Sequence, residues 1–137
     1  MNHYRKTIHK YRKRQNGDGC PFCDQEAIDS AIFENEHIYI VPNLTKYDLW
    51  ELHDVEDHLL VIPKAHVETL SELSTEERLA IMDQLADYEA RGYNIYARGV
   101  GFMKRSVKHQ HTHLIKASNK KPRVAIFLQR PYYLLKK

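Results

Sequence analysis

The sequence has few of the features that mark exported or membrane-spanning proteins. Its 137 residues include only two cysteines, Cys20 and Cys23, which are too few for a framework of disulfides. No apolar run approaches the length that spans a bilayer, and the N-terminus has no apolar stretch like that of a secretory signal. We therefore expect a cytoplasmic protein without a membrane segment, in which the two cysteines are thiols or metal ligands.

Glycine and proline are also scarce, with five residues of each, and no segment of the chain repeats another. Hydrophobic residues make up 42% of the sequence and charged residues 28%, which is typical of a globular domain that closes its own core. The turn-forming residues 16–19 are a flexible boundary. We predict one domain over residues 20–137, preceded by an N-terminal arm over residues 1–19.

The N-terminal arm lacks negative charge. Residues 1–14 hold six of the 21 basic residues and no acidic residue, although the net charge of the whole chain is only +3. Such a cluster is typical of segments that contact polyanions, so nucleic acid is one candidate partner. A solvated, frayed terminus is the plainer interpretation, and a transit peptide is a third.

Local patterns predict an α+β domain. We expect strands at residues 37–41 and 58–62, each closed by a proline, and further strands at residues 93–97, 108–116 and 123–128. A helix should begin after Ser74, which forms a capping box with Glu77, and should end at Gly92. Its apolar stripe is predicted to contain Leu79, Met82, Leu85 and Ala86, widened by Ile81 and Tyr88. One long helix among hairpin-length connections favours an antiparallel sheet.

Three histidines alternate with other residues in the strand predicted at residues 108–116. Because successive side chains of a strand point to opposite faces, His109, His111 and His113 should share one face. Buried imidazoles need polar partners, so three together require an explanation. They could act on a phosphate, bind a metal, or form a polar sheet face without a function.

A basic loop directly before this strand favours the phosphate interpretation. Residues 98–106 contain two glycines, the cations Arg98, Lys104 and Arg105, and the hydroxyl of Ser106. Glycines let backbone N–H groups approach an anion, and the cations neutralise its charge. A zinc ion alone would not require these cations. Without the histidines, the same loop would be interpreted as a solvated turn.

Three motifs resemble those of the histidine triad (HIT) superfamily. Residues 109–115 (His-Gln-His-Thr-His-Leu-Ile) match its His-x-His-x-His signature, and residues 58–66 (His-Leu-Leu-Val-Ile-Pro-Lys-Ala-His) match its second hallmark. Cys20-Pro-Phe-Cys23 looks like the start of the zinc-containing branch. The resemblance covers roughly residues 20–116. It implies a five-stranded antiparallel sheet with one long and one short helix, commonly paired into a homodimer.

The resemblance also implies a chemistry. His111 would attack the α-phosphate of a nucleotide to give a nucleotidyl-histidine that water hydrolyses, and His113 would help the leaving group to depart. The substrate would be a nucleoside phosphoramidate or a dinucleoside polyphosphate. The alternative is a non-catalytic, zinc-stabilised protein that binds nucleotides or nucleic acid. A metalloenzyme with catalytic zinc is a third interpretation.

The resemblance further implies ligands for a metal and for the substrate. One structural zinc per chain would be held by Cys20, Cys23, His66 and His109, with His53 and His58 as substitute ligands. Contacts to the substrate and its phosphate would come from Asn43, His58, Arg98, Arg105 and Ser106.

The sequence departs from the family pattern around this predicted phosphate site. Residues 104–107 read Lys-Arg-Ser-Val in place of Gly-Gln-Ser-Val, and Arg98 stands where the family often has Asn. Asp57 replaces a glycine, and the connection over residues 43–57 is longer than usual. These departures bear on the substrate more than on the reaction class.

Overall fold

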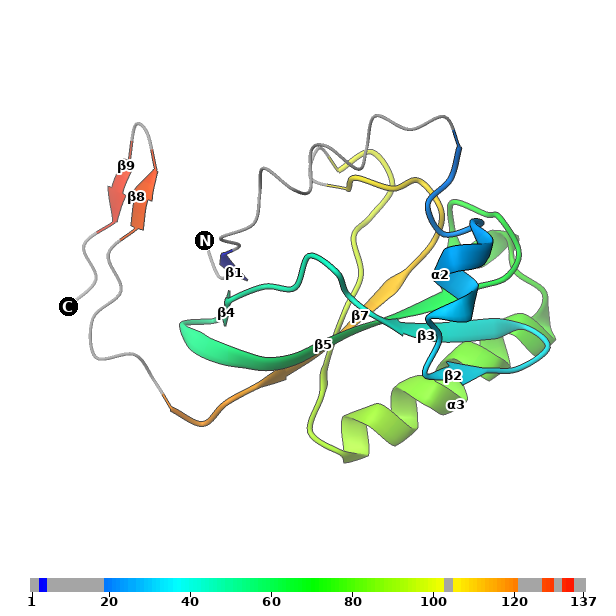
Figure 1. The fold of residues 1–137 in the computed structure, drawn as a ribbon, viewed down its shortest axis with the longest axis horizontal. Helices are drawn as coiled ribbons and strands as arrows, with labels where there is room; N and C mark the ends of the chain where they lie inside the picture. Colours follow the sequence, from blue (N-terminus) through cyan, green and yellow to red (C-terminus); the bar gives the residue numbers. More distant parts are fainter. Residues whose placement is uncertain (1–2, 5–18, 103–104, 121–126, 130–131, 135–137) are drawn as a thin grey trace.

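The computed structural model describes residues 3–4, 19–102, 105–120, 127–129 and 132–134. The six basic residues of the arm, Lys104 and the predicted strand residues 123–126 lie outside these ranges. Within them the chain forms an antiparallel sheet with one short and one long helix, as Figure 1 shows, which confirms the predicted α+β class. No helix in the described part of the chain is long and apolar enough to cross a membrane.

Among the described residues the main sheet has seven strands, where the resemblance implied five. Its strands are β1 (His3–Tyr4), β2 (Phe33–Glu34), β3 (Ile38–Pro42), β4 (Leu49–Trp50), β5 (His53–Pro63), β6 (Asn94–Tyr96) and β7 (Thr112–Ala117). The long strand β5 pairs with β3, β4 and β7, while β6 extends the sheet beyond β7. Strand β1 pairs with β4, so the start of the arm is attached to the sheet.

The structure describes only residues 127 and 128 of the strand predicted at residues 123–128. Strand β8 (Phe127–Gln129) pairs with β9 (Tyr132–Leu134) in a separate two-stranded sheet. The structure therefore does not place this part of the chain in the main sheet, where the sequence pattern predicted a fifth strand.

The polar connection predicted over residues 43–57 is shorter than expected, because β5 begins at His53 and not at residue 58. A hairpin joins β4 to β5 through Glu51 and Leu52, which have φ angles of 50° and 69°. Two-residue hairpin turns often need positive φ at both positions, and Asn-Gly is the usual signal for them. Glu-Leu carries no such signal, so the hairpin could not be predicted.

The long helix α3 (Thr75–Ala90) begins as predicted. The Ser74 hydroxyl accepts the Glu77 N–H (3.1 Å), and the Glu77 carboxylate accepts the Ser74 N–H (2.7 Å). Its buried face differs from the prediction, because Ile81 and Tyr88 are buried whereas Leu79 and Met82 are each 60% exposed. Apolar residues lie on both sides of this helix, so periodicity alone did not determine which side packs on the sheet.

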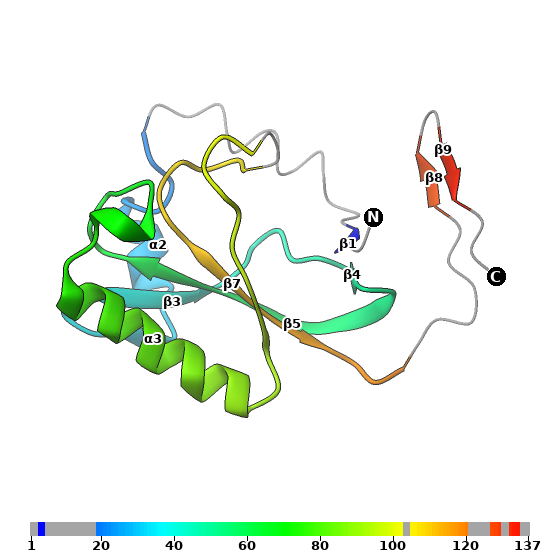
Figure 2. The same cartoon turned by 180° about the vertical axis from the view of Figure 1, so that it is seen from behind.

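The short helix α2 (Gln25–Asp29) and the long helix α3 lie on opposite sides of the sheet (Figures 1 and 2), and apolar residues pack between the sheet and each helix. On one face, alternate residues of β3 and β5 and Leu114 of β7 pack against α3. On the other face, the intervening residues of β3 and β5 pack against Phe22 and against Ile28 of α2. Since Leu114 faces α3, the alternation of β7 directs His113 to the opposite face.

Candidate functional site

The histidine segment begins outside the strand that was predicted to contain it. Strand β7 starts at Thr112, so His109 and His111 precede it and only His113 lies within it. This entry segment is fixed by a hydrogen bond from the Gln110 N–H to the Val67 carbonyl (2.7 Å). The three histidines are all buried. Strand alternation therefore positions His113, whereas contacts with other segments position His109 and His111.

The ring of His111 has its proton on Nδ1. This nitrogen lies 2.8 Å from the carbonyl oxygen of His109, which can only accept a hydrogen bond. Nε2 of neutral His111 therefore keeps its lone pair. Burial lowers the pKa of His111, and the positive charges of Arg105 and Arg98 act in the same direction. A neutral imidazole with a free Nε2 is a nucleophile.

The ring of His113 has the opposite tautomer. The Tyr47 N–H donates to Nδ1 of His58 (3.1 Å), so neutral His58 carries its proton on Nε2. From there it donates to Nδ1 of His113 at 2.9 Å, which leaves the proton of His113 on Nε2. The rings of His111 and His113 lie edge to face with centroids 5.2 Å apart. The site thus places a lone pair and a proton donor on neighbouring rings.

Asn43 and Arg98, both predicted substrate contacts, lie beside these histidines. The Asn43 amide nitrogen lies 3.0 Å from Nε2 of His58. Both nitrogens are donors in the tautomer that Tyr47 sets, so this is a close contact and the Nε2 proton of His58 goes to His113. The Arg98 guanidinium donates to the Tyr47 hydroxyl (2.6 Å), and the Tyr47 ring lies 5.9 Å from that of His113. Tyr47 is a contact that the sequence did not reveal, because its backbone N–H sets the tautomer of His58 and no residue pattern encodes this.

Trp50 of the β4–β5 hairpin packs into a local cluster. Its ring stacks on Tyr47 at 6.0 Å and contacts Tyr96 at 5.2 Å, and the Tyr96 ring lies 5.7 Å from His113. The β4–β5 hairpin therefore packs beside His113 through Tyr47 and Tyr96.

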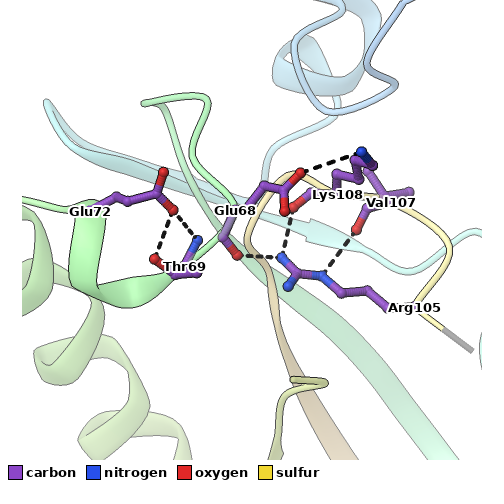
Figure 3. Close-up of polar contacts among 6 residues, drawn as sticks. All are labelled: Glu68, Thr69, Glu72, Arg105, Val107 and Lys108. Carbon is purple, nitrogen blue, oxygen red and sulfur yellow. Dashed lines mark hydrogen bonds and ion pairs between the residues drawn. The ribbon is translucent and has the colours of Figure 1, made fainter. Parts of the chain in front are cut away.

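Arg105, another predicted phosphate contact, donates to the protein's own backbone (Figure 3). Its guanidinium reaches the carbonyls of Glu68, Val107 and Lys108. Ser106 is half-buried in the same segment. The contact of Arg105 and Ser106 with a phosphate stays a prediction.

The four predicted metal ligands come together. The ligand atoms of Cys20, Cys23, His66 and His109 all lie within 4.8 Å of one another. Nδ1 of His109 is 3.4 Å and 3.5 Å from the two sulfurs, and Nδ1 of His66 is 3.1 Å from the Cys23 sulfur. A tetrahedral zinc site has N–S edges of about 3.5 Å. The four residues therefore fit a metal ion.

The protonation of His109 also fits a metal. Its Nε2 donates to the Pro63 carbonyl at 2.9 Å, so the lone pair of Nδ1 points to the thiols. Desolvation and the neighbouring Cys20 raise the pKa of Cys23 to about 11, a cost that a bound cation would remove. The substitute ligands are engaged elsewhere, since His53 donates to the Ser118 carbonyl (2.7 Å) and His58 contacts His113.

Comparisons with known proteins agree with this geometry. The sequence matches the family model of the HIT domain over residues 25–120. A HIT family hydrolase from Legionella pneumophila Philadelphia 1 shares 20% identity at a TM-score of 0.52, with 75% of this chain and 95% of that chain covered. A HIT family protein from Bacillus anthracis shares 23% identity at a TM-score of 0.55, with 84% and 85% covered.

A hypothetical protein from Leishmania major shares 21% identity at a TM-score of 0.59, with 83% of this chain and 85% of that chain covered. At such identities the likeness shows the fold. The comparison with curated proteins finds no match.

Proposed function

Because this chain belongs to the HIT domain family, we propose that it hydrolyses a nucleoside phosphoramidate or a dinucleoside polyphosphate at the α-phosphate. The proposal rests above all on one observation. His111 keeps a lone pair on Nε2 while the neighbouring His113 carries a proton on Nε2. A nucleophile and a hydrogen-bond donor for the leaving atom stand side by side, and each is held in its tautomer by a hydrogen bond at Nδ1 of its ring.

The reaction proceeds in two steps. Nε2 of His111 forms a bond to the α-phosphorus while the bond from phosphorus to the leaving nitrogen or oxygen breaks, and the Nε2–H of His113 hydrogen-bonds to the leaving atom, which takes its proton from water. Water then attacks the phosphorus, the bond to His111 breaks, and the proton released neutralises the hydroxide left by the first step. Arg98, Ser106 and Asn43 contact the nucleotide, with Arg98 offsetting its charge, and the His58 ring lies beside the phosphate and acts through His113.

The metal proposed for the Cys20–Cys23–His66–His109 cluster is a structural zinc, as in the zinc-containing branch of the family. Two thiolates and two imidazoles close a tetrahedral site and leave no position for substrate. The cluster ties the segment after the arm to His109 and so to the backbone that holds His111. Because these ligands need reduced thiols, we place the protein in the cytoplasm.

We also propose a homodimer, paired through α3 and the edge strand β6. Leu79 and Met82 of α3 are exposed, and Ile95 of β6 is 42% exposed. Among the described strands, β6 pairs only with β7, so its other edge is open to a second chain.

The test of the proposed reaction is His111→Asn assayed beside wild type on adenosine and guanosine 5′-phosphoramidates and on a diadenosine polyphosphate. Turnover should disappear while AMP binding and the melting temperature stay close to wild type. The control is His37→Asn, a half-buried histidine that directly precedes β3. Most of the activity surviving in His111→Asn would refute the mechanism. Nucleotide binding without turnover in wild type would favour the alternative, a zinc-stabilised binding protein.

A further inference from the structure

Arg105 connects two segments that are far apart in the sequence. Its Nη2 donates to the Glu68 carbonyl at 2.5 Å and to the Lys108 carbonyl at 2.7 Å, and its Nε donates to the Val107 carbonyl at 3.3 Å (Figure 3). Glu68 lies in the connection between β5 and α3, whereas Val107 and Lys108 directly precede His109. One side chain therefore holds the entry to the histidine segment against the connection.

The chemistry of this contact suits only arginine. A guanidinium is a planar fork with five N–H donors and no acceptor, so it can serve several carbonyls in different directions. A lysine keeps the charge but offers one nitrogen, and a glutamine offers one amide nitrogen. Arginine at this position is thus a departure from the family pattern with a structural consequence.

The Glu68 end of this contact is itself well fixed. The next residue, Thr69, donates from both its backbone N–H and its hydroxyl to the Glu72 carboxylate, each at 2.7 Å, as Figure 3 shows. This capping box begins the short 3-10 helix Leu70–Glu72. Arg105 therefore ties the histidine segment to an anchored part of the chain and not to a free loop.

The route from Arg105 to His111 is short. The Lys108 carbonyl belongs to the same peptide unit as the His109 N–H, and the His109 carbonyl accepts the Nδ1 proton of His111 at 2.8 Å. Gln110, between them, donates to the Val67 carbonyl (2.7 Å), next to Glu68. A tilt of the Lys108–His109 backbone would move the carbonyl that selects the nucleophilic tautomer of His111.

We propose that Arg105 is a positioning residue, which acts through the backbone carbonyls of residues 107–109 to keep the Nε2 lone pair of His111 available for attack. Only the expected fall in kcat rests on the proposed function. The tautomer of His111 can be observed in the ligand-free protein whatever the reaction is.

The experiment compares Arg105→Lys and Arg105→Gln with Lys108→Gln as the matched control. Lys108 belongs to the same loop, and Lys108→Gln removes one positive charge, as Arg105→Gln does. The exposed side chain of Lys108 forms an ion pair with Glu68 at 3.7 Å, and such pairs contribute little. All variants are full-length protein purified without chelator.

Two measurements are made on each variant. Long-range proton–nitrogen NMR spectra report which ring nitrogen of His111 carries the proton, with the signals assigned by comparison with His111→Asn. Steady-state kinetics on adenosine 5′-phosphoramidate separate kcat from KM, and titration gives the Kd for AMP.

We expect both Arg105 variants to show a mixture of His111 tautomers and a kcat lower by about tenfold or more, because small misplacements of a reacting group are costly. The Kd for AMP should stay within about twofold, and Lys108→Gln should match wild type. If Arg105→Lys keeps the wild-type spectrum and kcat, a positive charge at this position is enough and the several N–H donors of the guanidinium are not needed. That result would overturn the proposal. An unchanged spectrum with a weaker Kd for AMP would make Arg105 a phosphate ligand and overturn it as well.

These outcomes are separable from a failure of the proposed function. If wild type hydrolyses none of the substrates, the proposed reaction fails while the NMR spectra still decide whether Arg105 selects the tautomer. If His111→Asn abolishes turnover but the Arg105 variants change neither spectrum nor kcat, the reaction stands and the positioning role is wrong.

Discussion

Nε2 of His58 lies 2.9 Å from Nδ1 of His113, and both rings are buried. The proton in this hydrogen bond belongs to His58, because its other nitrogen accepts the Tyr47 N–H. His58 is therefore the residue that keeps the proton of His113 on Nε2, from which it would donate to the leaving atom in the proposed reaction.

Replacing His58 with Leu should impair departure of the leaving group in particular. Without a donor at Nδ1, the proton of His113 can move to that nitrogen and Nε2 no longer donates to the leaving atom, so we expect roughly a 100-fold loss of kcat on a phosphoramidate, whose leaving amine depends on that hydrogen bond. A nucleoside p-nitrophenyl phosphate, whose leaving group is stable without it, should lose far less. His58→Gln keeps an N–H donor and serves as the control. Equal losses on both substrates would show that His58 does not act through the leaving group.

Loss of the metal cluster should destabilise the protein. Elemental analysis should find one zinc per chain, and Cys20→Ser should lower the free energy of unfolding by several kcal/mol, on the order expected when metal binding is coupled to folding. The control is His53→Asn, which changes a histidine outside the cluster and should retain the zinc. An apo-protein with unchanged stability and activity would contradict a structural metal.

Sedimentation at micromolar concentration should show a dimer of the 16.2 kDa chain. Met82→Glu together with Leu79→Glu should produce monomers, since charged residues would then have to be buried at the interface. Leu44→Glu adds a charge at another apolar residue, which is 76% exposed, and should leave the dimer intact. A monomer in wild type would refute the predicted pairing.

The stability of the fold should fall at alkaline pH through Tyr93. Its hydroxyl donates to Asp57 at 2.6 Å, and Asp57 also accepts the N–H of His58. Burial, together with this hydrogen bond, raises the pKa of Tyr93 to about 12. The unfolded chain loses the proton near pH 10, so this stabilisation is complete below about pH 10 and is lost as the pH rises toward 12.

Urea unfolding of wild type and Tyr93→Phe tests this expectation. The variant should be less stable by about 1 kcal/mol at pH 8, where the hydrogen bond is intact. The difference should shrink between pH 10 and pH 12, because phenylalanine has no proton to lose. A constant difference across this range would contradict the assignment.

The basic arm is best tested by substitution and not by deletion, because β1 pairs with β4 beside the Trp50 cluster. Alanine at the six basic residues of positions 5–14 should weaken oligonucleotide binding and flatten its salt dependence, since fewer counterions are released. Hydrolysis of a small phosphoramidate should stay nearly unchanged. If small-substrate turnover is lost instead, the arm belongs to the catalytic site.

The sequence alone determined the features that are encoded by neighbouring residues. The Ser74–Glu77 capping box is a contact between residues three apart, and it forms as predicted. The alternation that places Leu114 and His113 on opposite faces is likewise a property of one strand. The resemblance of the Cys-x-x-Cys pair and the histidine motifs to the HIT superfamily also implied which four residues would form a cluster.

Only the tertiary structure decided how the site is tuned. The tautomer of His58 depends on a backbone N–H eleven residues away, and the Arg105 guanidinium reaches a carbonyl 37 residues away. The exposed side of α3 depends on how the helix lies on the sheet. Backbone N–H and carbonyl groups are the same in every residue, so no sequence pattern records which of them will face a given side chain. Their direction is fixed only when the strands and connections have packed together.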